Sequence, residues 1–470
     1  MVGPEPGRCC RLGSCHVSSS TPGGAAPRLY HLHPLSAGRI SDWPRHFPRV
    51  RAMCFDGVLV GSPFAAGAAG SLAAPAEPFE LDPRVADGAT AAAPALAALV
   101  ERAAAEGLAV WLEVIVATAA EDGLLARTHP HWIARDASGA PVPAGGDGAV
   151  ALALDANDEA QLEHLAARGR AYLDAGVAGL RFSAAHQVPA ALWRAVLARL
   201  RAHAPGAWFV ADVLGAPAQL LGALAGVGFD GVTDSSRWWN FHDGWFLEQH
   251  AALRAIGVPF AFPEHDGEPR RAAALDGGDP DAVGAVLEAA YLKAVALGTG
   301  LFMPMGFEFG CRRPLDRVRA SAAEFEAEAA TPLVDLQDRI AAANALKESH
   351  PALRVPGELR RVNAPNARLA ALARLSHPSP ARAEEAMFVV ANPDPGQSDG
   401  LELPGLLTAV GGRFETLTEV RLDGGGEAVD PTRPLTLGPG AVRLLASRQV
   451  KPKAARTARA AASEKRVLQA

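Results

Sequence analysis

The chain has 470 residues, a length that suits one large domain and a smaller one. Its formal net charge of −6 gives no support to nucleic-acid binding, and no run approaches the roughly 20 apolar residues of a membrane helix. The five cysteines, an odd number, match no common zinc spacing. We therefore expect a cytoplasmic protein with no nucleic-acid or membrane partner, no metal and no cofactor.

The two ends of the chain differ from the rest in composition. Residues 1–27 are rich in Gly, Pro, Ser and Cys, and we expect them to be disordered. Residues 448–470 form a basic, Ala-rich tail, which we also expect to be disordered. The folded part of the chain is therefore expected between these two segments.

Between these ends, short runs rich in Val, Phe, Leu and Ile alternate with longer stretches of helical period. Eight of the short runs predict strands, at residues 28–33, 55–61, 109–116, 178–182, 207–211, 229–233, 258–262 and 300–304. Six of the longer stretches predict helices, at residues 94–106, 159–174, 189–204, 217–226, 245–256 and 279–297.

This alternation of strands and helices predicts an α/β fold, the (β/α)8 TIM barrel, over residues 28–350. Within it we expect a short domain B at about residues 117–155 and a closing helix at residues 332–348. The alternative is a doubly wound dinucleotide-binding sheet, which requires a Gly-rich turn after the first strand. The chain has His33 and Pro34 at that point, so we favour the barrel.

The pattern changes after residue 351. Short apolar runs are now separated by Pro, Gly, Asn and Asp, and they lie at residues 369–375, 386–391, 412–419, 434–437 and 441–446. Such a pattern is typical of antiparallel sheets. We therefore predict a C-terminal antiparallel β domain, a β-sandwich, over residues 351–447.

Polar and aromatic residues gather at the predicted carboxyl ends of the barrel strands. In chain order they are Glu113, Arg181, Ser183, Asp212, Asp234, Trp238, Trp239, His265, Asp266 and Glu308. The βα loops of a TIM barrel meet at this end, so we expect these side chains to share one mouth. Because carboxylates accept hydrogen bonds from sugar hydroxyls and indole rings stack on sugar C–H faces, the set predicts a carbohydrate site.

Several of these residues also have a purely structural interpretation. Asp is a residue type that often caps the N-terminus of a helix, and this is the alternative role for Asp234. For Trp238 and Trp239, the alternative is that one of the two rings lies in the core. Glu308 follows Gly306 and has the alternative of accepting hydrogen bonds from backbone donors.

Residues 179–186 resemble the nucleophile segment of the α-amylase superfamily (glycoside hydrolase family 13), whose pattern is Gly-x-Arg-x-Asp-Ala. Ser183 stands where that pattern has Asp. Further segments resemble bacterial maltosyltransferase-like members of the family, and they lie at residues 30–35, 129–133, 229–232, 238–241, 303–310 and 344–353. The order and spacing of these segments carry the resemblance over nearly all of the chain.

The resemblance implies a retaining mechanism, in which an Asp attacks the anomeric carbon, a Glu donates a proton and a second Asp stabilises the transition state. Carried over by position, these roles fall on Ser183, Asp212 and Asp266 in that order. Arg181 and His265 match the neighbouring Arg and His of the family.

The remaining binding residues of the resemblance are Glu113, Trp238, Trp239 and Glu308. Glu113 falls on the Asp of the third strand. A serine hydroxyl lacks the charge of the carboxylate nucleophile, and Asp is one methylene shorter than the Glu proton donor.

We therefore predict a protein of α-glucan metabolism that resembles a maltosyltransferase, binds an α-glucan or maltooligosaccharide and has impaired catalysis, as a pseudoenzyme or a weak enzyme. Two alternatives stay open. One is an active retaining α-1,4-glucan maltosyltransferase or glucan hydrolase with altered catalytic residues, and the other is a non-catalytic regulatory or scaffold subunit of a glucan enzyme. A homodimer and an association with a glucan enzyme are also left open.

Overall fold

The structure is a computed structural model that describes residues 24–145, 148–241, 243–275 and 277–449. Apart from residues 24–27 and 448–449, the two segments expected to be disordered lie outside the described residues. Among the helices that are described, none combines the length and the apolar composition needed to cross a bilayer.

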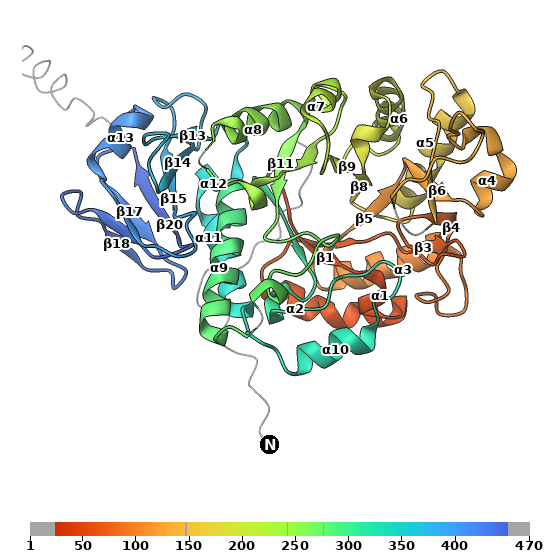
Figure 1. Cartoon of the computed structure of the whole chain (residues 1–470), viewed down its shortest axis with the longest axis horizontal. Helices are drawn as coiled ribbons and strands as arrows, with labels where there is room; N and C mark the ends of the chain where they lie inside the picture. The colour runs from red at the N-terminus through yellow and green to blue at the C-terminus, as the bar shows by residue number, and fades with distance from the viewer. Residues whose placement is uncertain (1–23, 146–147, 242, 276, 450–470) are drawn as a thin grey trace, which may run out of the picture.

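Eight parallel strands close into a barrel at the centre of the molecule (Figure 1). In order around the barrel they are β1 (Arg28–Leu32), β12 (Gly300–Pro304), β11 (Val258–Ala261), β10 (Gly231–Thr233), β9 (Trp208–Ala211), β8 (Gly179–Ser183), β5 (Ala109–Ile115) and β2 (Gly57–Val60). Each of the eight predicted strand runs overlaps one of these strands. The predicted TIM barrel is confirmed.

Helices surround the barrel. The larger ones are α3 (Ala92–Ala105), α5 (Glu159–Asp174), α6 (Ala190–His203), α7 (Ala218–Leu224), α8 (Trp245–Ile256), α9 (Pro280–Leu297), α10 (Ala322–Ala330) and α11 (Gln337–Ser349), and the short ones are α1 (Pro34–Ala37), α2 (Phe47–Ala52), α4 (Leu124–Thr128) and α12 (Pro351–Arg354). Asp158 begins α5 because its side chain accepts hydrogen bonds from Ala160 N and Gln161 N. The predicted closing helix is α11, which begins later than expected.

The inside of the barrel is filled by side chains, as in other TIM barrels. Trp111, Trp208, Phe260 and Phe302 form one buried cluster there. Gly300 leaves room for the Phe260 ring, since a Cβ at this position would lie 2.4 Å from Phe260 Cδ1. A ligand therefore has no space along the barrel axis and has to bind at an end of the barrel.

Two hairpins lie beside the barrel on the side away from the C-terminal domain (Figure 1). β6 (Thr118–Ala120) pairs antiparallel with β7 (Ala149–Ala151), inside the segment predicted as domain B. β3 (Phe64–Ala66) pairs with β4 (Pro75–Leu81), and the sequence analysis did not predict this second hairpin. The two hairpins contact each other through β4 and β6.

The C-terminal domain contains a six-stranded antiparallel sheet and a two-stranded sheet. The first has the order β13 (Arg360–Arg361), β14 (Ala370–Leu375), β15 (Glu385–Ala391), β20 (Val442–Arg448), β17 (Thr418–Val420) and β18 (Gly426–Ala428), and the second pairs β16 (Asp399–Leu401) with β19 (Leu435–Leu437). The predicted antiparallel β domain is therefore present after residue 351. Two details differ from expectation: β17 begins only at Thr418, after Gly411 and Gly412 at positive φ, and α13 (Pro404–Val410) is a helix that was not predicted.

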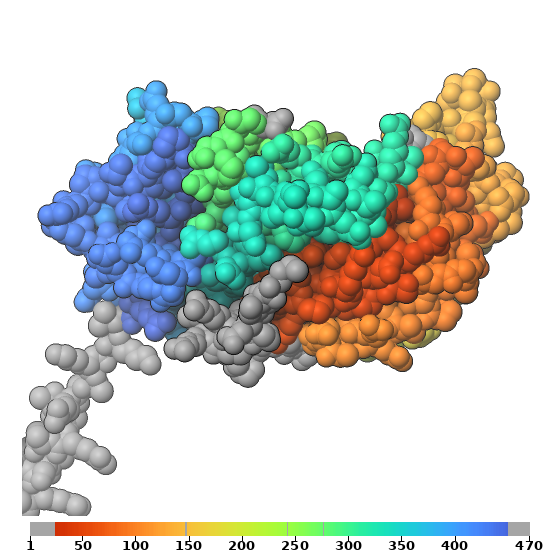
Figure 2. Space-filling view, turned by 90° about the horizontal axis from the view of Figure 1, so that it is seen from below, coloured from red at the N-terminus to blue at the C-terminus, as the bar shows by residue number. Residues whose placement is uncertain are grey.

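Alternate residues of the central strands face opposite sides, as strand geometry requires. Met387 and Val389 belong to the core that the sheet shares with the barrel helices. Phe388 and Val390 belong to a second core on the other face, together with Leu437 of β19. Figure 2 shows the resulting close packing of the C-terminal domain, in blue, against the green and teal residues of the barrel.

The end of α9 links the two domains. A helix leaves its last four carbonyl oxygens without partners inside the helix. Lys347 Nζ donates to Val295 O at 3.0 Å and to Gly298 O at 2.7 Å, and Arg374 Nη1 of β14 donates to three carbonyl oxygens at the same end. Burial lowers the pKa of Arg374 to about 10. Arg374 therefore joins the C-terminal sheet to the barrel, while Lys347 of α11 donates to the same end of α9.

Candidate functional site

Ser183 is the last residue of β8 and lies beside β5 at the carboxyl end of the barrel. The strand register places Glu113 opposite Arg181 and Ile115 opposite Ser183. The Ser183 hydroxyl donates a hydrogen bond to Glu113 Oε1. Ala184, the next residue, has a φ of 50°, a left-handed conformation that costs a non-glycine residue energy. The hydroxyl at the predicted nucleophile position is therefore held by a buried carboxylate.

Asp212 follows β9 and forms a buried ion pair with Arg181. Arg181 Nη2 donates to Asp212 Oδ2 at 2.5 Å, and Arg181 Nη1 lies 3.9 Å from Glu113 Oε2. Thr233 Oγ1 donates to Asp212 Oδ1 at 3.0 Å. Burial opposes ionisation of Asp212, but Arg181 and His265 outweigh it and lower its pKa. Asp212 is thus an ionised acceptor, whereas a general acid has to carry a proton.

Asp266 follows β11 and contacts the side chains of His265 and Arg317. His265 Nε2 lies 3.3 Å from Asp266 Oδ1, and Arg317 Nη2 donates to Asp266 Oδ2 at 2.9 Å. The same Arg317 nitrogen donates to Glu113 Oε1 at 3.2 Å. Burial opposes ionisation of Asp266, but His265, His31 and Arg317 outweigh it and hold its pKa well below its ordinary value. Arg317 therefore joins Glu113 and Asp266 into one charged cluster.

Arg317 lies in the loop between β12 and α10, and neighbouring loops fix its backbone. Leu72 N donates to Arg317 O at 3.1 Å, and Arg84 Nη1 donates to Val318 O at 2.7 Å. Asp316 Oδ1 accepts from Val318 N at 2.8 Å. Because these contacts hold both sides of Arg317, its guanidinium is directed to the carboxylates by the fold itself.

Very little space remains between these groups. Two cavities of about 10 Å³ each lie against Asp266, one beside Glu113 and Arg317 and the other beside Arg181 and His265. A volume of this size holds about one water molecule. A sugar ring does not fit between the carboxylates while Arg317 is in this position.

Three buried side chains carry atoms of the kind that coordinate metal ions. These atoms of His31, Glu113 and Asp266 lie within 4.8 Å of one another. His31 Nε2 is 3.9 Å from Glu113 Oε2, and burial lowers the pKa of His31. Arg317 pairs with both of these carboxylates, and Arg181 lies 3.9 Å from Glu113 while it pairs with Asp212 at 2.5 Å. The three carboxylates Glu113, Asp266 and Asp212 therefore share two guanidinium groups in one ion-pair network.

The two adjacent tryptophans have different environments. Trp238 is 40% exposed, and its ring meets Phe262 edge-on with centroids 5.6 Å apart. Trp239 is only 3% exposed, and its Nε1 donates to Ser235 Oγ and Gln249 Oε1 at 3.1 Å each. Trp239 was predicted to bind a ligand, and the structure places its ring in the core with its one donor already used.

Glu308 is also buried away from any ligand. It accepts hydrogen bonds from Tyr30 Oη at 2.7 Å and from Gly306 N at 2.9 Å, and Arg49 Nε lies 3.2 Å from it. Glu308 was predicted to bind substrate, and the structure leaves its side chain no exposed surface. The structural alternative, an acceptor for a backbone donor, describes Glu308.

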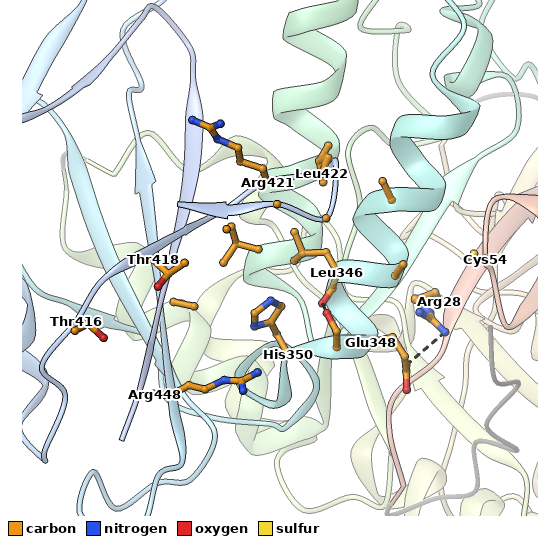
Figure 3. Close-up of a pocket in the computed structure, with 18 of the residues that line it drawn as sticks. Arg28, Cys54, Leu346, Glu348, His350, Thr416, Thr418, Arg421, Leu422 and Arg448 are labelled. Atoms are coloured by element: carbon orange, nitrogen blue, oxygen red, sulfur yellow. Dashed lines mark hydrogen bonds and ion pairs between the residues drawn. The ribbon is translucent and has the colours of Figure 1, made fainter. Parts of the chain in front are cut away.

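A larger cavity of about 840 Å³ lies between α11 and the C-terminal sheet (Figure 3). Its wall includes Arg28, His350 and Arg448, and Arg28 Nη2 lies 3.5 Å from Glu348 Oε2. Arg28 begins β1, so this cavity lies at the amino end of the barrel strands. None of the predicted site residues lines it.

Comparison with known proteins extends this description. No family model matches the chain. The chain is 33% identical over 437 residues to the α-1,4-glucan:maltose-1-phosphate maltosyltransferase of Burkholderia pseudomallei, and the alignment covers 91% of this chain. The chain is therefore a homologue of this maltosyltransferase over 91% of its own length. It spans 38% of the length of this maltosyltransferase, so the activity of the whole relative is not carried over by the alignment.

Solved structures of an α-amylase and of an α-glucosyl transfer enzyme share the fold. An α-amylase from Geobacillus thermoleovorans, complexed with acarbose, has a TM-score of 0.70 and 13% identity, covering 90% of this chain and 99% of the amylase. An α-glucosyl transfer enzyme has a TM-score of 0.69 and 14% identity, covering 91% of this chain and all of the enzyme. At these identities the likeness establishes the fold alone.

Sequence reasoning missed three contributors to this site. Arg317 is the most important, and its loop carries no motif that marks it. His31 and Thr233 lie at the ends of β1 and β10, so a strand-end search that included histidine and hydroxyl side chains finds both. Ser183, Asp212 and Asp266 belong to one network through Glu113, Arg181 and Arg317.

Proposed function

We propose that this chain is an α-glucan-binding member of the α-amylase superfamily in which the retaining transfer reaction is impaired. One observation carries the proposal: the side chain at the nucleophile position is the hydroxyl of Ser183, and it donates its hydrogen bond to Glu113. Retaining transfer requires a carboxylate that attacks the anomeric carbon and forms a glycosyl-enzyme intermediate. A serine attacks only when a base removes its proton.

Glu113 is a poor base for this purpose. Burial opposes its ionisation, but Arg317 and Arg181 outweigh it and lower its pKa. A lowered pKa means that the carboxylate binds a proton weakly, which is the opposite of what activation of a serine hydroxyl needs. The Ser183–Glu113 pair therefore supports a structural hydrogen bond rather than a nucleophile and its base.

The position of Asp212 supports the same conclusion. Its carboxylate accepts hydrogen bonds from Arg181 and Thr233, and its pKa is lowered, so it holds no proton for the leaving group at neutral pH. General acids of glycoside hydrolysis instead have raised pKa values. The described site therefore supplies neither a suitable nucleophile nor a suitable proton donor for a retaining reaction.

The proposed ligand class rests on the relative and on Trp238. The name of the B. pseudomallei relative gives an α-1,4-glucan and maltose 1-phosphate as its substrates. The exposed Trp238 ring offers a stacking surface of the kind that sugar C–H faces contact. We infer an α-glucan or maltooligosaccharide as the ligand of this chain.

The test combines turnover and binding. Purified protein is incubated with maltohexaose, with and without maltose 1-phosphate, and both phosphate release and chain length are followed beside heat-inactivated protein. The proposal expects no turnover and saturable binding of maltohexaose. Turnover that Asp266→Ala abolishes supports the active-enzyme alternative, and the absence of both turnover and binding supports the scaffold alternative.

A further inference from the structure

A pocket of about 280 Å³ lies between the carboxyl ends of β9, β10 and β11 and the helices α7 and α8. It borders the charged cluster, because its lining includes His265, which contacts Asp266, and Thr233, which donates to Asp212. The described lining does not include Ser183, Glu113, Asp266 or Arg317. Its volume is close to the lower end of small-molecule sites, which begin at about 300 Å³. By contrast, the cavities against Asp266 hold about 10 Å³ each.

Asp234 is one of the residues that line this pocket, and one of its two carboxylate oxygens is buried without a hydrogen-bond partner among the described residues. Its carboxylate is buried, and Oδ1 accepts hydrogen bonds from Ser236 N at 2.9 Å and from Ser236 Oγ at 2.7 Å. Among the described residues, none donates a hydrogen bond to Oδ2. Burial raises the pKa of Asp234 to about 6. A buried acceptor without a partner is costly, so a ligand hydroxyl would stabilise it.

Trp238 lines the same pocket, in the short 3-10 helix Ser236–Trp238. Phe262 holds its ring edge-on, and the Arg237 guanidinium lies 5.2 Å from the ring centroid. Arg237 in turn pairs with Glu268 at 2.9 Å. These contacts fix the orientation of an indole that is still 40% exposed, which gives the pocket a rigid aromatic wall.

The third feature is Gln249 of α8. Its Oε1 accepts from the Ser235 hydroxyl and from Trp239 Nε1, which sets the orientation of the amide. The amide nitrogen keeps its role as a donor. The pocket thus combines an acceptor, a donor and an aromatic wall, while Glu268 is already neutralised by Arg237.

We propose that this pocket, beside the charged cluster, binds one or two sugar units at the end of an α-glucan. The sugar stacks on Trp238, one hydroxyl donates to Asp234 Oδ2, and another accepts from Gln249. The ligand is neutral, because the described lining offers no unpaired Lys or Arg that selects an anion. This inference rests on the proposed α-glucan ligand and adds where that ligand is held.

The experiment measures maltose binding by isothermal titration calorimetry in the full chain and three variants. Trp238→Ala removes the aromatic wall, Asp234→Asn removes the acceptor, and Trp245→Ala is the matched control. Trp245 is an indole with 42% exposure that does not line the pocket. We expect saturable binding that is at least about tenfold weaker in Trp238→Ala and in Asp234→Asn, and unchanged within about twofold in Trp245→Ala.

Folding is checked by thermal melting of each variant. Where Trp238→Ala fails to fold, Trp238→Phe replaces it, and maltose is expected to quench tryptophan fluorescence in the wild type and not in Trp238→Phe. Equal affinity in the wild type and Trp238→Ala, or no saturable maltose binding, overturns the inference. Maltose binding that Asp266→Ala abolishes and Trp238→Ala spares refutes the pocket but not the proposed function. Glucan turnover by the wild type refutes the proposed function but not the pocket.

Discussion

Replacing Arg317 by Met tests the charged cluster most directly. The substitution keeps most of the aliphatic volume and removes the guanidinium that contacts Asp266 at 2.9 Å and Glu113 at 3.2 Å. Removing one partner of a buried ion pair typically costs about 3–5 kcal/mol. Arg317 is 24% exposed, and Arg181 and His265 remain beside the carboxylates, so we expect a loss near the lower limit, about 3 kcal/mol.

This loss converts into a small shift of the melting temperature because the chain is long. An unfolding entropy of about 2.1 cal/mol/K per residue gives about 0.9 kcal/mol/K for the 426 residues from 24 to 449, so the melting temperature should fall by about 3 °C at pH 7. The assay is differential scanning fluorimetry. Arg313→Met is the control, since Arg313 forms an exposed pair with Glu324 and should shift the midpoint by less than about 1 °C.

The shift should also depend on pH. The pKa values of Asp266 and Glu113 are lowered in the folded protein, so their ion pairs stabilise it above about pH 4. That contribution is lost as the pH falls further and the carboxylates bind protons. The difference between the wild type and Arg317→Met should therefore shrink at pH 3. Equal melting temperatures at pH 7, or a difference of the same size at pH 3, would refute the reasoning.

Three further predictions concern the site and the domain contact. The double variant Ser183→Asp, Asp212→Glu should remain inactive on maltohexaose, because Arg317 still fills the mouth of the barrel. Adding Arg317→Ala should then give a measurable change in the chain length of maltohexaose. Activity of the double variant would show that Arg317 does not block the site. Asp234→Asn should stabilise the protein by about 3 kcal/mol above pH 6 and leave its stability unchanged below about pH 3. The reason is that the pKa of Asp234 is about 6 in the folded state, above the unfolded value, so the cost of ionising the folded protein grows between these two pH values. Urea unfolding at pH 7 and pH 3 measures this, and equal effects at both pH values would contradict it. Arg374→Met should destabilise the protein by about 3 kcal/mol, because it leaves carbonyl oxygens at the end of α9 without a donor. Urea unfolding measures the change in the free energy of unfolding, and a change below about 1 kcal/mol would contradict the proposed link between the domains.

The barrel was predictable from the sequence because buried parallel strands consist of continuous apolar runs, and these recur between helical stretches. Strand ends also located Glu113, Arg181, Asp212 and Asp266 at one mouth, since the topology of the barrel brings those ends together. The β3–β4 hairpin was not predictable in the same way, because its seven-residue strand has an irregular register and little apolar alternation.

Side-chain direction was harder to predict than strand position. Trp238 and Trp239 are neighbours of one type, and only the packing of α8 decides that Trp239 is buried against Gln249 while Trp238 is exposed. Arg317 was missed because its role depends on loops that meet only in three dimensions, through Leu72 and Arg84. Local sequence contains no signal for such a contact.

The most direct test of impaired retaining chemistry is to trap the covalent intermediate. The wild type is incubated with 5-fluoro-α-maltosyl fluoride, whose glycosyl-enzyme ester with a carboxylate nucleophile hydrolyses slowly, and the intact mass is measured. The triple variant Ser183→Asp, Asp212→Glu and Arg317→Ala is treated in parallel as the positive control. We expect no added mass in the wild type and a maltosyl adduct on position 183 of the triple variant. A maltosyl adduct on any carboxylate of the wild type would contradict the account.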